Sequence, residues 1–275
     1  MNKKAILLGI MVFVSIVFGF LTFRVYEAEA GGTIYIRSDG LVFPSTAPIH
    51  REGDVYTLMD NINDSIVIER NDVVVDGAGI YTLKGPGDYD SVGIDLTERH
   101  NVTVKNFRGI EAFGYGILLN LSSNIIVCGN TVTLNNRGGI YLSEAANSSI
   151  YGNNMTLNMN YDVQLYTSSN NEIYRNNPRR ILLQYSSNNN SVYENDIVVS
   201  GQEGIGLSWS ANNNKIYGNN ITGGLYGIRA YYASSQRIWG NSINDAKYGL
   251  DFTESSNNVI RGNTVKNTTT AVFLD

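Results

Sequence analysis

The chain has 275 residues, a net charge of −5 at pH 7 and only 16% charged residues. This composition disfavours nucleic acid as a partner, because phosphate binding needs clustered lysine and arginine. The 18 tyrosines and only four prolines exclude a disordered chain, which would lack aromatic and β-branched residues. Cys128 is the only cysteine, so no intrachain disulfide forms and stability must come from a packed core.

The N-terminal segment has the pattern of an export signal. Lys3 and Lys4 precede an uncharged run over residues 5–23, and Ala28-Glu29-Ala30 offers a small-residue cleavage site. The run is also long enough to span a bilayer as a retained hydrophobic helix. We therefore predict that residues 1–30 are a signal peptide or an N-terminal membrane anchor. The remainder is expected to be extracellular, at the cell surface or periplasmic, and to meet the membrane only through this segment.

Residues 31–70 are predicted to form a cap on the N-terminal end of the fold. Short alternating segments indicate strands, and a loop containing Pro44 and Pro48 separates them. The terminal elements of a repetitive fold are atypical because they must cover the open end of its core.

Residues 71–275 contain a repeat that is marked by asparagine. Successive marker asparagines are 23, 23, 19, 24, 22 and 22 residues apart, at Asn130, Asn153, Asn176, Asn195, Asn219, Asn241 and Asn263. Most follow an aliphatic residue, a variable residue and glycine, as in Ile216-Tyr217-Gly218-Asn219. A fixed period in the twenties indicates a solenoid.

A second marker is the quartet Gly-Ile-x-Leu, clearest at residues 93–96, 116–119, 139–142 and 204–207. Short alternating strands and Ser/Asn/Gly turns surround it, and no capped helical period follows residue 30. The spacings of leucine-rich repeats and of calcium-binding nonapeptide repeats are absent. These observations predict an all-β parallel β-helix of about 9–10 rungs, each of 22–24 residues.

The marker asparagines are expected to build a structural ladder. Equivalent residues of neighbouring rungs lie about 4.7–4.9 Å apart in a parallel β-helix, so their side chains stack. An asparagine amide at a turn can bond to the amides of neighbouring rungs and to local backbone. Asparagine also tolerates the left-handed backbone conformation that turns can require.

The combination of Gly-Ile-x-Leu with Ser-Asn-Asn-x-Ile-x-Gly-Asn resembles the NosD-type right-handed parallel β-helix repeat. The resemblance covers roughly residues 65–275 and is clearest over 210–221 and 255–265. The repeat is related to a domain shared by carbohydrate-binding proteins and sugar hydrolases. The family name implies periplasmic copper delivery, but His50 and His100 are far apart and the methionines are scattered. Copper needs clustered soft or imidazole ligands, so we predict no metal site and no cofactor.

The sequence offers no recognisable catalytic set. The Asn-Thr-Asp, Gly-His-Gly and Asp-Pro-His-Asp motifs of related hydrolases and epimerases are absent, and we predict no catalytic residues. Arg229 and Asp251 are the nearest approach to a charged pair on neighbouring rungs, and we expect an exposed structural pair. Arg179 and Arg180 coincide with the 19-residue step, which indicates either a shortened turn or an anion-binding notch.

Two columns of aromatic residues are the most distinctive surface feature. The first is expected to face outward and comprises Tyr151, Tyr174, Tyr193, Tyr217 and Trp239. The second is looser and comprises Tyr141, Tyr166, Tyr185, Trp209, Tyr231 and Tyr232. Such columns can stiffen a solenoid by stacking, or they can form a platform for sugar rings, and the two interpretations are compatible.

The leading functional hypothesis is an exported, non-catalytic protein that presents an aromatic and polar surface to carbohydrate or to the cell envelope. One alternative is a polysaccharide lyase or glycoside hydrolase with an unfamiliar site. Another is a purely structural surface-layer or adhesin stalk. Residues 271–275 have the pattern of a further strand that stops within a rung, so we also expect a truncated or partner-capped end, with self-association at the open rung.

Overall fold

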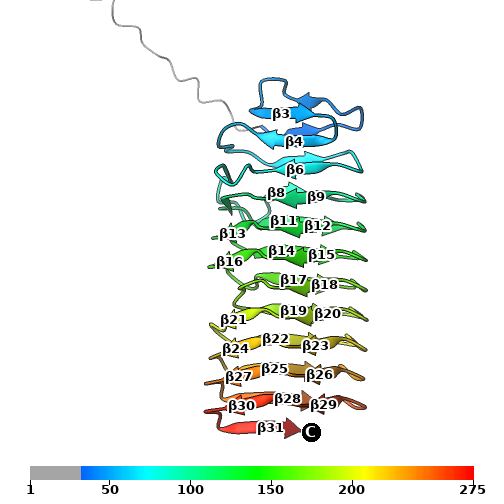
Figure 1. Ribbon diagram of the computed structural model, residues 1–275, viewed down its shortest axis with the longest axis vertical. Coiled ribbons are helices and arrows are strands. Elements are labelled where there is room, and N and C mark those ends of the chain that lie inside the picture. Colours follow the sequence, from blue (N-terminus) through cyan, green and yellow to red (C-terminus); the bar gives the residue numbers. More distant parts are fainter. Residues whose placement is uncertain (1–31) are drawn as a thin grey trace, which may run out of the picture. The chain divides into compact units, whose positions relative to one another are not determined.

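The structure, a computed structural model, describes residues 32–275 (Figure 1). The predicted signal peptide or membrane anchor, and with it the N-terminal hydrophobic helix, lies outside the described residues. The fold is an all-β right-handed parallel β-helix of about ten turns, as predicted. Among residues 32–275 no helix is long and apolar enough to cross a membrane.

Three strand positions recur in most rungs, and the strands of successive rungs stack along the long axis of the solenoid (Figure 1). The first position forms a 12-stranded sheet, called the first sheet below. Its strands are β1 (Ile34–Ile36), β2 (Val42–Phe43), β5 (Ile66–Ile68), β8 (Val92–Asp95), β11 (Tyr115–Asn120), β14 (Gly138–Ser143), β17 (Val163–Tyr166), β19 (Ile181–Gln184), β22 (Glu203–Ser208), β25 (Tyr226–Tyr231), β28 (Tyr248–Thr253) and β31 (Thr270–Leu274).

The second position forms an 11-stranded sheet, called the second sheet below. Its strands are β3 (Ile49–Glu52), β4 (Val55–Leu58), β6 (Val74–Asp76), β9 (Thr103–Lys105), β12 (Ile126–Cys128), β15 (Ser149–Tyr151), β18 (Glu172–Tyr174), β20 (Ser191–Tyr193), β23 (Lys215–Tyr217), β26 (Arg237–Trp239) and β29 (Val259–Arg261). The antiparallel pairs among the described residues, β1 with β2 and β3 with β4, lie within the segment predicted as a cap. Because β1, β4 and β5 also pair in parallel with strands of the solenoid, the boundaries of that cap stay a prediction.

The third position is divided between two four-stranded sheets. One contains β7 (Thr82–Lys84), β10 (Gly109–Glu111), β13 (Thr131–Thr133) and β16 (Asn154–Thr156). The other contains β21 (Asp196–Val198), β24 (Asn220–Thr222), β27 (Ser242–Asn244) and β30 (Thr264–Lys266). The division falls at the 19-residue step, where the chain passes from β18 directly to β19 without a third strand.

The core is built from columns of aliphatic residues that point inward from each sheet. In every quartet the second and fourth residues are buried, as in Ile205 and Leu207 of β22, whose exposed fractions are 0% and 1%. The quartet glycine has a different role, because its backbone faces the next rung at close range. A Cβ atom at Gly139 would lie 2.6 Å from the carbonyl oxygen of Asp162, so a larger residue does not fit.

The marker asparagines form a continuous hydrogen-bonded ladder at the turn between the second and third strand positions. Asn195, which is buried, donates from Nδ2 to the Ile173 carbonyl at 2.9 Å and to Asn219 Oδ1 at 3.0 Å. Its own Oδ1 accepts from the Asn176 backbone N–H and Nδ2, both at 3.1 Å. The ladder thus satisfies backbone groups that the turn would otherwise leave buried and unpaired.

The left-handed conformation at this turn belongs to the residue before the asparagine. Gly218 has φ 63°, and where glycine is missing, Arg175 and Glu194 adopt φ 53° and 52°. The asparagine itself immediately precedes the following strand, and its side chain is buried.

A second polar ladder at the turn between the first and second strand positions was not anticipated. It comprises Asn171, Asn190, Asn214 and Gln236, and each backbone N–H donates to the side-chain oxygen of the next member.

Candidate functional site

The first aromatic column lies on the outer face of the second sheet, with its residues in register on successive strands. Consecutive ring centroids, from Tyr151 to Trp239, are 4.9, 4.8, 4.8 and 4.4 Å apart, and no ring plane is tilted by more than 14° from the next. The spacing equals that of parallel strands, so the rings stack face to face. Each internal ring has both faces covered and presents its edge to solvent. The geometry favours a stiffening ladder here over a flat platform.

The hydroxyl groups of this column are held in the protonated state. Burial, followed by the nearby charge of Glu172, raises the pKa of Tyr193 to about 12. Burial is also the main cause of the raised pKa values of Tyr174 and Tyr217. Tyr193 donates its hydroxyl hydrogen to Glu172 Oε2 at 3.4 Å. The column therefore offers ring edges and phenolic donors near neutral pH.

The second aromatic column lies at the turn that follows the first sheet, and it is the more exposed of the two. The exposed fractions are 45% for Tyr185, 46% for Trp209 and 43% for Tyr232. Trp209 is nearly parallel to Tyr185 at a centroid distance of 6.4 Å and to Tyr232 at 5.4 Å. Since both distances exceed the strand spacing, the rings are offset, which leaves part of each face uncovered.

Backbone geometry explains why these side chains project outward. Tyr185, Trp209 and Tyr232 have φ values of 51°, 53° and 49°, in the left-handed region. Leu121 has the same conformation, with φ 51°, at the equivalent turn of an earlier rung, so the turn itself imposes it. Side chains at this position are turned away from the core. Tyr166 adjoins the column at 4.9 Å from Tyr185, and Tyr231 packs edge-on against Trp209 and Tyr232.

Tyr141 does not belong to the second column, contrary to expectation. Its ring stacks on Tyr115 at 4.8 Å, on the outer face of the first sheet. The Tyr115 and Tyr161 hydroxyl oxygens are 3.3 Å apart, and the Arg137 guanidinium lies 4.7 Å from the Tyr115 ring centroid. Burial raises the pKa of Tyr161 above its ordinary value. Tyr141 is therefore part of a separate tyrosine cluster nearer the N-terminus.

Polar side chains on the first sheet run beside the second column. Gln164 donates from Nε2 to Gln184 Oε1 at 2.6 Å, and Gln184 donates from Nε2 to Ser208 Oγ at 3.3 Å. Gln184 and Ser208 immediately precede Tyr185 and Trp209 in the sequence. Amide and hydroxyl groups thus border the exposed rings, an arrangement that the column pattern alone did not reveal.

The ion pair between Arg229 and Asp251 is not the exposed pair that we expected. Arg229 Nε lies 3.2 Å from Asp251 Oδ1, and the Asp251 side chain is only 6% exposed. The Arg229 guanidinium is covered by the rings of Tyr226 and Tyr231, at 4.5 and 5.4 Å from their centroids. Stacking on both rings partly shields Arg229, whose side chain is 32% exposed, while Asp251 is almost fully buried.

Glu203 is a carboxylate that sequence reasoning missed. It pairs with Arg180, and its side chain is 13% exposed on the outer face of β22. Asp251 lies on β28, and only β25 separates the two strands in the sheet. Two strand spacings place the two carboxylates about 9.5 Å apart along the solenoid axis. The sequence signal for Glu203 was its position directly before the quartet glycine, Gly204.

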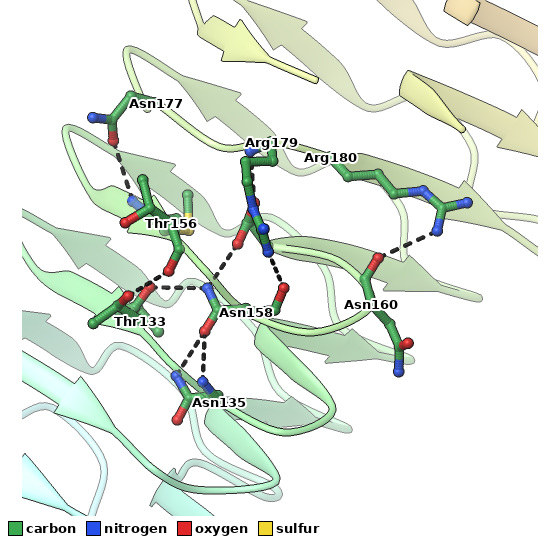
Figure 2. Close-up of polar contacts among 11 residues, drawn as sticks. Thr133, Asn135, Thr156, Asn158, Asn160, Asn177, Arg179 and Arg180 are labelled. Carbon is green, nitrogen blue, oxygen red and sulfur yellow. Dashed lines mark hydrogen bonds and ion pairs between the residues drawn. The ribbon is translucent and has the colours of Figure 1, made fainter. Parts of the chain in front are cut away.

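Arg179 and Arg180 do not form the anion-binding notch that was considered. Arg179 pairs with the buried Asp162, whose Oδ2 accepts from the Arg179 backbone N–H at 2.6 Å, and its guanidinium donates to the Asn158 carbonyl (Figure 2). Burial raises the pKa of Asp162 despite these contacts. Arg180 reaches Glu203 and the Asn160 carbonyl. Both arginines are engaged within the protein.

The shortened rung provides the structural reason for this arrangement. Asn135 donates to Asn158 Oδ1 at 2.9 Å, and Asn158 donates to Asp162 Oδ1 at 2.7 Å, so Asp162 ends a short ladder (Figure 2). Asn177 Oδ1 accepts from the Met155 backbone N–H at 3.2 Å, beside the missing third strand. Side chains therefore replace the hydrogen bonds that a strand would have supplied.

The described residues do not fit a copper site. Residues 32–275 contain no group of three or more His, Cys, Asp or Glu side chains placed to hold a metal ion. Met155 is fully buried in the core, whereas Met159 is 73% exposed at a turn. Cys128 lies beside Tyr151 at the end of the first aromatic column. These scattered donor atoms do not form the cluster of soft or imidazole ligands that copper requires.

Comparison with known proteins gives one family and several similar folds. The sequence model of the NosD family, described as "Periplasmic copper-binding protein (NosD)", matches residues 86–178 and 175–274. A search of curated proteins gives no match.

The solved structures that resemble the chain are distant in sequence. DFA-IIIase from Arthrobacter chlorophenolicus A6 is 13% identical with a TM-score of 0.58, over 82% of this chain and 63% of that one. A mutant of the periplasmic alginate epimerase AlgG is 12% identical with a TM-score of 0.55, over 84% of this chain and 83% of that one. ORF18 of Geobacillus virus E2 is 15% identical with a TM-score of 0.51, over 77% of this chain and 52% of that one. At these identities the likeness shows the fold alone.

Proposed function

This chain belongs to the NosD family, and from that premise we propose that it is an exported, non-catalytic protein that binds carbohydrate through its second aromatic column. The N-terminal signal pattern and the periplasmic description of the family support export. One protein of similar fold is named as an alginate epimerase, so this solenoid is able to carry a carbohydrate site. Copper delivery is not proposed, because the described residues lack the donors for it.

The observation that carries the proposal is the exposure of Tyr185, Trp209 and Tyr232, which are 43–46% exposed on three successive rungs. A sugar ring has an apolar C–H face and a rim of hydroxyl groups. The offset aromatic faces suit the apolar C–H face, and the neighbouring Gln184 and Ser208 side chains can form hydrogen bonds with the hydroxyl groups. Nothing in the core requires three large rings at this turn, since Leu121, Glu144 and Thr167 occupy it on other rungs.

The two tryptophans allow a direct test, because one lies in each aromatic column. In a Trp239→Phe protein, Trp209 is the only tryptophan, and its fluorescence should change when neutral or acidic hexasaccharides are added. Trp209→Ala in the otherwise natural chain should weaken binding, measured by calorimetry, by about tenfold or more, as expected for a central aromatic contact. Leu121→Ala is the matched control, because Leu121 is 50% exposed at the equivalent turn of a distant rung. Equal binding by the Trp209→Ala and Leu121→Ala proteins would reject the column as the site.

A second candidate is glycoside hydrolysis, and one observation favours it. Glu203 and Asp251 lie on strands of the first sheet that are about 9.5 Å apart along the solenoid axis, which is the upper end of the carboxyl separations of enzymes that invert stereochemistry. Both carboxylates are paired with arginine, which makes binding without catalysis our preferred proposal. Release of new reducing ends by the natural protein, abolished by Glu203→Gln or Asp251→Asn, would replace our proposal with this one.

A further inference from the structure

A cationic pocket lies on the outer face of the second sheet, at the C-terminal end of the first aromatic column. Its volume is about 320 Å³, and it is lined by Lys215, Arg237, Trp239, Val259 and Arg261. The strand register explains the cluster, since Lys215 pairs with Arg237 and Trp239 pairs with Arg261. Alternate residues of a strand share a face, so all three cations and the indole lie on one side of the sheet.

The charges of this pocket are not neutralised within the described part of the protein. Among residues 32–275, no carboxylate lies within ion-pair distance of Lys215, Arg237 or Arg261. On the same side of the solenoid Arg175 does pair with Glu194, at 2.8 Å. Like charges opposite each other on neighbouring strands destabilise a sheet. No ion pair within the described residues offsets this repulsion. It stands out in a chain whose net charge is −5.

Trp239 adds an apolar wall to the pocket. One face of its indole stacks on Tyr217 at 4.4 Å, and the Arg261 guanidinium is 5.8 Å from its ring centroid. Trp239 is the last aromatic member of the column, so its second face meets the Arg261 guanidinium instead of another ring. A guanidinium group binds carboxylate or sulfate through two parallel hydrogen bonds, and an adjacent aromatic face suits a sugar ring.

We propose that this pocket binds the carboxylate or sulfate group of an anionic sugar. The inference rests on the proposed carbohydrate-binding function, and it identifies the ligand class as an acidic glycan. The pocket occupies the same rungs as the second column. Trp209 lies in the turn that leads to Lys215, and Tyr232 lies in the turn that leads to Arg237. Its volume suits a single sugar residue, and the net negative charge of the chain disfavours a polyphosphate backbone.

The test uses a Trp209→Phe protein, in which Trp239 is the only fluorescent indole. It is titrated with hexagalacturonate and with the fully methyl-esterified hexamer, in which each carboxylate is replaced by a neutral methyl ester. A sulfated hexasaccharide and its desulfated counterpart form a second arm, which distinguishes carboxylate from sulfate. In at least one arm we expect the charged member to bind about tenfold more tightly, with an affinity that falls as sodium chloride is raised.

A triple variant, Lys215→Gln, Arg237→Gln and Arg261→Gln, should lose the preference for the charged sugar. All three side chains are exposed, so the fold should be retained, and an unchanged melting temperature checks this. Arg175→Gln is the control, since it removes a cation that is already paired and should keep the preference.

Equal affinity for the charged and uncharged members of both arms would overturn the inference, as would a preference that survives in the triple variant. Displacement of the sugar by the same concentration of inorganic sulfate would reduce the pocket to a simple anion site and would also overturn it. If neutral sugars still change the fluorescence of Trp209 in the Trp239→Phe protein, only this inference fails. If no sugar affects either tryptophan, the proposed function fails with it.

Discussion

At the scale of single residues, the asparagine ladder shows how one side chain stabilises a whole turn. The members from Asn130 to Asn241 are buried. Each, as Asn195 shows, donates from Nδ2 to a carbonyl of an earlier rung and donates from both its backbone N–H and its Nδ2 to the Oδ1 of the next asparagine. A shorter side chain at such a position leaves several backbone and amide groups buried without partners. The repetition of asparagine follows from this hydrogen-bond requirement.

Replacing one ladder member should therefore destabilise the protein strongly. Asn195→Ala is expected to lower the free energy of unfolding by about 3 kcal/mol, because the partners on both neighbouring rungs lose their hydrogen bonds. Asn220→Ala is the control, since Asn220 is exposed and bonds only to Asp196 on the surface. Its effect should stay within about 0.5 kcal/mol. Urea unfolding compares the two, and equal losses would contradict the role of the ladder.

The tyrosines of the first column predict a loss of stability at high pH. The pKa of Tyr193 is raised to about 12 from an ordinary value of 10.0, mainly by burial. Between pH 10 and 12 the unfolded chain has released this proton while the folded state still holds it. The stabilising contribution is therefore complete below pH 10 and is lost as the pH rises toward 12.

Absorbance at 295 nm should show tyrosines that ionise later than free tyrosine, and thermal melts should show a falling melting temperature over the same interval. Tyr193→Phe should make that fall less steep. Ionisation of every tyrosine near pH 10 would show that the stacked column does not hold its protons.

At the scale of elements, the strands of the first sheet explain the Gly-Ile-x-Leu quartet. The first glycine lies where the next rung approaches, whereas the third position faces outward. On β22 a Cβ atom at Gly204 would lie 2.9 Å from the Gly227 carbonyl oxygen. At Gly206 the nearest atoms to a Cβ would belong to the side chains of Leu182 and Glu203. One strand thus holds two glycines with opposite constraints.

This difference makes a matched pair of substitutions. Gly204→Ala should destabilise the protein by about 2 kcal/mol, because backbone of the adjacent rung must move. Gly206→Ala should cost less than about 1 kcal/mol, because flexible side chains can shift aside. Guanidinium unfolding of both variants checks the prediction, which would fail if Gly206→Ala were the more damaging change.

The short rung is an element-scale feature that the spacing indicated only in part. A 19-residue step predicts a shortened turn, and the structure shows that the third strand is absent there. The roles of Asp162, Arg179 and Asn177 were not predictable. They depend on which backbone groups lose their partners when a strand is removed, and this is decided between rungs.

At the scale of the whole molecule, the proposed function depends on columns of residues that cross the rungs. Residues about 22 positions apart become neighbours, so a site is assembled from several repeats. The second aromatic column and the cationic pocket lie on the same rungs, on either side of one turn. A long acidic glycan would contact both, which is why a combined surface is proposed in place of an enclosed cavity.

The sequence by itself determined the fold, because a period of 22–24 residues with inward Ile and Leu and turn asparagine is compatible with few architectures. It also indicated the residues of the two aromatic columns, with the exception of Tyr141. Only the tertiary structure decided which rings are covered, since that depends on the offset between stacked side chains. It likewise decided that Asp251 is buried and that Lys215, Arg237 and Arg261 are left without carboxylate partners among the described residues. The physical reason is that exposure and charge pairing arise between rungs, where side-chain direction and turn conformation are set by packing.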